Sequence, residues 1–250
     1  MIDQRLQDAT PPPRPGYVTR TLLRWLMRPA RIAAAEVLSP HFRLVDLEGE
    51  ALKGVAWVVG QKLQIAMCTG LTARTYTPMS WGAEQGRTRL LAFAHGDGPG
   101  SRWIDGLRDG DMCQFFGPRR SLDLSGLSAP LVLFGDETSF ALAAALLATP
   151  GLPGLNATCM FEATDVAESR PVLEVIGLGS ATLIARGTGD AHLGAVAAEL
   201  SSHSEGGAHF VLTGKAQSIQ HVSRALKTAG VGSSRIRAKA YWAPGKTGLD

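Results

Sequence analysis

Three side chains with complementary chemistry stand close together in the segment RTYTP, residues 74–78. If the segment is a strand, Arg74 and Tyr76 point one way and Thr77 the other. A guanidinium can bind a phosphate with two hydrogen bonds, and a phenol ring can lie against a flat heteroaromatic system. This combination suits a cofactor that has a pyrophosphate and a large planar ring. An ordinary strand edge with an exposed arginine and tyrosine is the alternative.

A second segment, HGDGPGSRW (residues 95–103), has glycines at positions 96, 98 and 100, which allow close approach of the backbone. We expect Ser101 to be the N-cap of a helix that begins with RWIDGL. The free N–H groups at such a helix start bind anions, so this turn is a candidate pyrophosphate site. A plain capped turn remains the alternative.

The third segment, GDET (residues 135–138), places Asp136 and Thr138 where a buried strand should give way to a helix. An N-cap with an acidic first turn would have the same residues. The segment is neither GxGxxG nor followed by GK[ST], which argues against a P-loop ATPase.

Two kinds of element must position these segments. Period-two alternation at 42–49, 61–67, 88–95 and 112–117 predicts short strands of a small antiparallel barrel. Further along, predicted strands at 130–136, 157–163, 181–187, 208–215 and 235–242 alternate with predicted helices at 137–150, 191–202 and 217–230. Such alternation is typical of a parallel sheet wrapped by helices. We therefore expect a mobile tail at 1–16, a barrel with an N-terminal basic helix at 17–125 and an α/β domain at 126–250, with the site in the cleft between the domains.

The composition of the 250 residues excludes several classes of protein. A hydrophobic fraction of 45% with 19% charged residues is typical of a soluble globular protein, and no run approaches the roughly 20 apolar residues of a membrane span. The N-terminus lacks the apolar core of an export signal. Cys68, Cys113 and Cys159 show no CxxC spacing and the histidines no ligand spacing, so we expect neither a disulfide framework nor a metal site, and a cytoplasmic location.

Positive charge is concentrated at the N-terminus. Residues 1–32 carry six arginines against two aspartates, a net +4, which leaves 3 − 4 = −1 for the rest of the chain. Arg20, Arg24, Arg28 and Arg31 recur at helical spacing, which predicts a basic helix. This helix could recruit an acidic partner or a membrane surface, or simply pack its apolar side on the body. Nucleic acid is not expected as a partner.

Together, RTYTP, HGDGPGSRW, GDMCQFFGP, LFGDET and the YW at 241–242 resemble the siderophore-interacting protein family over residues 30–245. These are FAD-containing ferric-siderophore reductases of the ferredoxin-reductase-like superfamily. The resemblance implies an FAD-binding barrel followed by an NAD(P)H-binding-like domain. It also implies roles near the cofactor for Arg74, Tyr76, Thr77, His95, Gly98, Pro99, Ser101, Asp136, Thr138 and Trp242.

The implied reaction passes electrons from NADH, NADPH or a ferredoxin-like donor through the flavin to a chelated Fe(III). Cations at the cleft would attract an anionic chelate, and the candidates are Lys53, Arg119, Arg120, Lys239 and Lys246. The chain departs from the family pattern, with SFALA after GDET, Lys215 in LTGK and Ala243 after YW. A flavin reductase with another acceptor, or a binding module without catalysis, therefore stays open.

Overall fold

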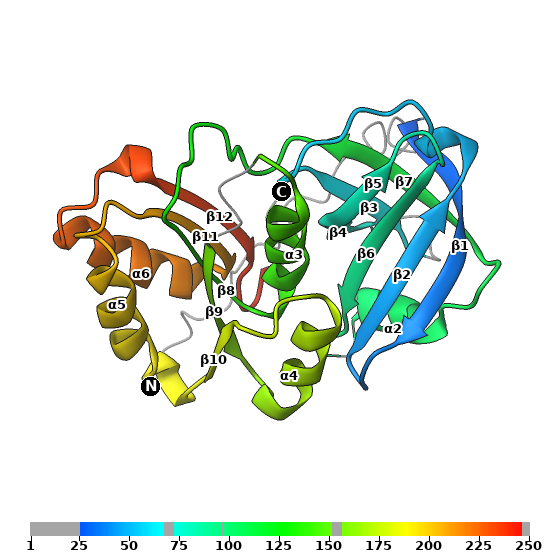
Figure 1. The fold of residues 1–250 in the computed structure, drawn as a ribbon. Coiled ribbons are helices and arrows are strands. Elements are labelled where there is room, and N and C mark those ends of the chain that lie inside the picture. Colours follow the sequence, from blue (N-terminus) through cyan, green and yellow to red (C-terminus); the bar gives the residue numbers. More distant parts are fainter. Residues whose placement is uncertain (1–25, 68–72, 97, 152–156, 247–250) are drawn as a thin grey trace, which may run out of the picture.

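The computed structural model describes residues 26–67, 73–96, 98–151 and 157–246, which form two halves, each built on its own sheet (Figure 1). The first sheet is antiparallel and barrel-like, and the second is parallel and carries helices. The predicted fold class is therefore confirmed.

The antiparallel sheet closes because its two edges are neighbours in the chain. Its strands are β1 (Arg28–Val37), β2 (Phe42–Glu48), β3 (Lys62–Ala66), β4 (Ala73–Tyr76), β5 (Pro78–Gly82), β6 (Arg87–Phe93) and β7 (Met112–Arg119), with the short helices η1 (Glu50–Leu52) and α2 (Pro99–Gly106) between them. The order β4-β3-β7-β1-β2-β6-β5 puts β4 and β5 at opposite edges. Only Thr77 separates these strands in the sequence, so the sheet must curl until its edges approach.

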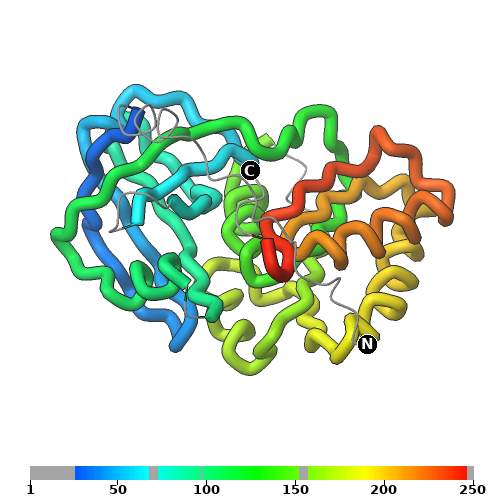
Figure 2. The backbone as a smooth tube through the Cα atoms, turned by 180° about the vertical axis from the view of Figure 1, so that it is seen from behind, coloured from blue at the N-terminus to red at the C-terminus, as the bar shows by residue number. Residues whose placement is uncertain are grey.

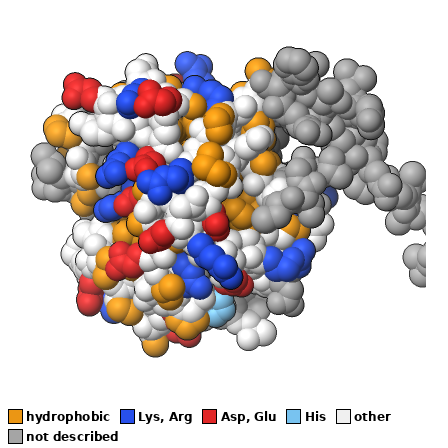
Figure 3. Space-filling model, turned by 90° about the vertical axis from the view of Figure 1, so that its right-hand side faces the viewer, with side chains coloured by type: hydrophobic (Ala, Val, Ile, Leu, Met, Phe, Trp, Pro, Cys, Tyr) orange, Lys and Arg blue, Asp and Glu red, His pale blue; other side chains and the backbone are white. Residues whose placement is uncertain are grey.

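Alternation along the strands separates an apolar interior from a charged outer face. Strand β2 buries Val45 and Leu47, whereas Asp46 between them forms an ion pair with Arg89 of β6, with Nε 2.7 Å from Oδ1. Cationic and anionic side chains are interspersed on this side of the molecule (Figure 3).

The second half is a parallel sheet with helices on both faces. It contains β8 (Leu131–Gly135), η2 (Glu137–Ser139), α3 (Phe140–Ala148), β9 (Ala157–Ala163), α4 (Val166–Val175), β10 (Thr182–Ala185), η4 (Thr188–Asp190), α5 (Leu193–Ser202), β11 (His209–Lys215), α6 (Ala216–Thr228), η5 (Ser233–Arg235) and β12 (Ile236–Trp242). In the order β10-β9-β8-β11-β12, Leu131 and Leu133 of β8 pack with α3 and α4, while Val132 and Phe134 pack with α5 and α6. Among the described helices none is both long and apolar enough to cross a membrane.

Helix α3 joins the two halves through a shared apolar core. It lies between the two sheets (Figure 1), and the Phe140 ring stacks on Phe42 of β2 at a centroid distance of 5.8 Å and an interplanar angle of 3°. The chain passes from one sheet to the other between Arg119 and Leu131 (Figure 2). A continuous core of this kind holds the halves in one arrangement.

One predicted helix does not extend as far as expected, and one observed helix was not predicted. Arg28 and Arg31 lie in strand β1, so the predicted basic helix does not extend to them, because this stretch pairs with β2 and β7. The sequence pattern also does not predict helix α4, which contains Pro171 and begins at the N-cap Asp165. The tail at 1–16, Arg20, Arg24 and Cys68 lie outside the described residues, and Cys113 and Cys159 are buried free thiols.

Candidate functional site

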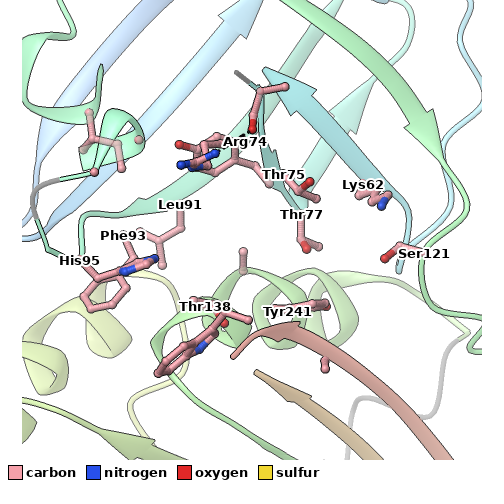
Figure 4. A pocket seen from close by; sticks show the side chains of 18 of the residues that line it. Lys62, Arg74, Thr75, Thr77, Leu91, Phe93, His95, Ser121, Thr138 and Tyr241 are labelled. Atoms are coloured by element: carbon pink, nitrogen blue, oxygen red, sulfur yellow. Dashed lines mark hydrogen bonds between the residues drawn. The ribbon is translucent and has the colours of Figure 1, made fainter. Parts of the chain in front are cut away.

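A pocket of about 330 Å³ lies between the two halves and is lined by side chains of both. Figure 4 shows Arg74 and His95 toward one end, Lys62 and Ser121 toward the other, and Thr138 and Tyr241 across from Thr77. This volume lies within the range of small-molecule and cofactor sites, which start at roughly 300 Å³.

One end of the pocket combines a cation with the start of a helix. Helix α2 begins at Pro99 with Gly98 as its N-cap, and no side chain caps it. The N–H groups of its first turn, including that of Gly100, have no partner within the helix. A Cβ atom on Gly100 would lie 3.2 Å from Cγ of Arg74, so the glycine lets this turn lie directly beside the guanidinium side chain. A cation beside uncapped helix N–H groups is a phosphate-binding arrangement.

Aromatic rings and hydroxyls form the middle of the pocket. The Tyr76 ring packs against Trp103 of α2 with centroids 5.7 Å apart, and burial raises the pKa of Tyr76, which keeps the phenol neutral. Thr77 forms a side-chain hydrogen bond with Tyr241 of β12, across the boundary between the halves. Burial raises the pKa of Tyr241 to about 12.

On the side of the second half, Asp136 organises the turn after β8. Its Oδ1 accepts hydrogen bonds from the backbone N–H of Thr138, at 3.0 Å, and from the Thr138 hydroxyl, while its Oδ2 accepts one from Nε1 of Trp242 at 2.7 Å. The Trp242 ring in turn stacks on His95, with centroids 6.2 Å apart. Burial raises the pKa of Asp136 to about 6, with a contribution from Glu137, against the hydrogen bonds that lower it.

A buried ionic network lies behind this turn. Arg186, which follows β10, pairs with Glu137 (Nη2–Oε2, 3.0 Å), and its guanidinium lies 5.8 Å from the centroid of the Trp242 ring. Nδ1 of His192 accepts from the Gly187 N–H at 3.0 Å, so the proton of the neutral ring is on Nε2, which is 2.6 Å from Glu162. The network fixes the loop after β10 relative to β9.

Comparisons with known proteins agree with this architecture. Residues 69–122 match the profile described as "Siderophore-interacting FAD-binding domain", and residues 129–245 match "Siderophore-interacting protein". The chain belongs to the siderophore-interacting protein family. No curated protein matches its sequence significantly.

Three solved structures share the fold of this chain. A siderophore utilization protein from T. fusca is 22% identical, with 90% of this chain and 95% of that chain covered and a TM-score of 0.67. SipS, a siderophore-interacting protein from Aeromonas hydrophila, is 19% identical, with 88% and 93% covered and a TM-score of 0.70. Phthalate dioxygenase reductase is 16% identical, with 90% and 71% covered and a TM-score of 0.70. At these identities the likeness shows the ferredoxin-reductase-like fold alone.

The structure brings most of the candidate residues of this family member together. The predicted residues that line the pocket are Arg74, Tyr76, Thr77, His95, Gly98, Ser101, Thr138, Trp242, Lys239 and Lys246. Pro99 is the first residue of α2, and Asp136 is fully buried behind the wall. The prediction that Ser101 is the N-cap is wrong, because the helix begins at Pro99 with Gly98 as its N-cap, three residues earlier than expected. The Ser101 hydroxyl donates to the carbonyl of His95 at 3.0 Å.

Three predicted cations are not among the lining residues. Lys53 is paired with Glu50 (2.6 Å), Arg119 donates to Gln64 (3.1 Å), and Arg120 is exposed beyond the end of β7. Conversely, Lys62, Ser121 and Tyr241 line the pocket without having been predicted to do so. Lys62 belongs to a predicted strand but carried no motif, and only the pairing of β3 with β4 and β7 brings it here.

Proposed function

We propose that this protein is an FAD-dependent reductase of ferric siderophores. The observation that carries the proposal is one pocket in which the guanidinium side chain of Arg74 lies beside the start of helix α2 at one end, with further cations, including Lys246, in its lining. Such a distribution of positive charge suits two ligands, a cofactor that contains a pyrophosphate and a separate anionic substrate. Membership of the siderophore-interacting family supports the choice of substrate.

The residues of the barrel half fit FAD. Arg74 and the first turn of α2 would hold the pyrophosphate, and Tyr76 with Thr77 would border the flavin ring. Gly98 and Gly100 allow the close backbone approach that a phosphate requires. When bound, FAD supplies a ring that accepts a hydride and releases electrons one at a time.

The substrate side depends on the cations of this chain. Lys62, Lys239 and Lys246 all line the pocket, and they would attract and orient an anionic ferric chelate. Each Fe(III) takes one electron and becomes Fe(II), which hard oxygen ligands hold less tightly. The electrons come from a reduced pyridine nucleotide or a reduced ferredoxin-like iron–sulfur protein. Cytoplasmic location stays a prediction.

Stopped-flow absorbance of the FAD-loaded protein tests the proposal. The protein is reduced anaerobically with dithionite, freed of excess reductant and mixed with a ferric hydroxamate in the presence of a colorimetric Fe(II) chelator. We expect flavin reoxidation and coloured Fe(II) complex in a ratio of two Fe(II) per flavin. Reoxidation by other acceptors but not by ferric chelates would favour a flavin reductase with another acceptor. Failure to bind FAD would favour a binding module.

A further inference from the structure

The carboxyl group of Asp136 lies behind the pocket wall and yet contacts two of the residues that form it. Asp136 has 0% exposure and is not itself a lining residue, whereas Thr138 and Trp242 are. Its two oxygens accept hydrogen bonds from the Thr138 N–H, the Thr138 hydroxyl and the Trp242 indole N–H. All of the donors therefore point at one group.

The backbone of β11 packs closely against the carboxyl group of Asp136. A Cβ atom on Gly214 of β11 would lie 2.6 Å from Cγ of Asp136, and Gly214 has a φ of +107°, which favours glycine. Asp136 also caps η2 in a capping box with Ser139. The carboxyl group is thus confined between β8 and β11 at the carboxyl edge of the sheet.

These contacts determine which hydrogen-bonding groups the pocket offers. A hydroxyl has one hydrogen to donate, and that of Thr138 is committed to Asp136. Its oxygen can therefore only accept from a ligand in the pocket. The indole N–H of Trp242 is likewise engaged, so the ring is held where it stacks on His95 from the other half.

We propose that Asp136 is a positioning residue, which holds Trp242 against His95 and makes the Thr138 hydroxyl an acceptor for N–H groups of the bound ring system. The inference rests on the proposed function, since the ligand is taken to be FAD. It assigns to Asp136 an indirect role, because its carboxyl group acts through Thr138 and Trp242.

Protonation of Asp136 should disturb this arrangement. The neutral acid accepts hydrogen bonds less strongly than the carboxylate, and its own hydrogen enters a site where donors already converge, so the bonds to Thr138 and Trp242 weaken. Glu137 and Arg186 also face Asp136, from η2 and from the loop after β10, with opposing effects on its charge, and the Tyr241 phenol faces it from β12. Affinity for FAD should therefore fall as pH drops through about 6.

The test is titration of the apoprotein with FAD, followed by quenching of flavin fluorescence, at pH 8 and at about pH 5. The wild type should bind about tenfold more weakly at the lower pH. D136N presents an amide NH₂ to one of the donors, so it should bind about tenfold more weakly at pH 8, with no further loss at low pH. D123N is the matched control, because Asp123 also accepts a local backbone hydrogen bond (Ser125 N–H, 2.9 Å) but does not line the pocket. It should behave as the wild type.

A double-mutant cycle shows whether Asp136 acts through Trp242. W242F removes the indole N–H and keeps an aromatic ring, and the double variant D136N/W242F should bind FAD no more weakly than D136N alone. Additive losses would overturn the role through Trp242. A pH step that persists in D136N would assign the titration to His95 and overturn the role of Asp136. If D136N does not fold, the pH profiles of wild type and W242F decide, since the step should shrink in W242F.

The proposed function and this inference fail in different ways. A wild type that binds no FAD at either pH contradicts the proposed function. A wild type that binds FAD with the same affinity as D136N at both pH values contradicts the inference alone.

Discussion

Replacing Arg74 by alanine should weaken FAD binding by about one to two decades. A hydrogen bond with a charged partner contributes roughly 1.5–3 kcal/mol, and each 1.4 kcal/mol corresponds to about a factor of ten in affinity. The variant should still fold, because the bond that the Arg74 guanidinium makes within the described part of the chain is a local one, to the neighbouring carbonyl of Ala73 at 3.1 Å. The loss should therefore appear in cofactor affinity and hardly in stability.

Two further variants sharpen this prediction. R74K keeps the positive charge but not the planar fork that binds a phosphate bidentately, so its affinity should lie between those of the wild type and R74A. R87A is a matched control, since Arg87 lies on the outer face of the barrel and pairs with Glu48 at 2.7 Å. It should bind FAD as the wild type does.

The assay is titration of each apoprotein with FAD by fluorescence quenching, with the melting temperature measured in parallel. Equal affinities of wild type and R74A would refute the assignment of Arg74 to the pyrophosphate. A drop in affinity of R87A as large as that of R74A would also refute it, because it would show a general effect of lost charge.

Three other substitutions test the substrate side and the junction of the halves. K246A should weaken binding of an anionic ferric chelate and reduce the salt dependence of its association rate in stopped-flow experiments; unchanged kinetics would remove Lys246 from the substrate site. E168A should lose about 1–2 kcal/mol in urea unfolding at pH 7, because Glu168 of α4 accepts hydrogen bonds from the Ser39 hydroxyl (2.7 Å) and from the His41 N–H (2.8 Å). Burial alone would raise the pKa of Glu168, but these hydrogen bonds outweigh it and lower the pKa from its unfolded-state value of 4.5. The stabilisation by Glu168 is therefore present above pH 4.5 and is lost as the pH falls through the lowered pKa, and an equal loss of stability in E168A at pH 3 would contradict this. L142A should cost about 2–5 kcal/mol and lower one common transition seen by far-UV circular dichroism and tryptophan fluorescence, since Leu142 is fully buried in the shared core; two separate transitions would contradict a single cooperative unit.

Local sequence determined most of the elements. Alternating residues such as those of β2 bury one face and expose the other, and the continuous apolar run of β8 is typical of a strand covered on both faces. Both patterns depend only on neighbours in the chain. Helix α4 was not predicted: Pro171 disfavours a helix locally, whereas the cap at Asp165 and packing on the sheet stabilise one.

One part of the site could likewise be predicted from local sequence, whereas the other part depends on tertiary packing. RTYTP and the glycine-rich turn mark one end of the pocket, because each is a short segment whose residues act together. The opposite wall depends on tertiary structure, since Thr77 meets Tyr241 and His95 meets Trp242 only when α3 packs the two sheets together. Asp136 illustrates the limit: its residue type and its place after β8 are written in the sequence, but its burial and its bond to Trp242, 106 positions away, are consequences of the packed fold.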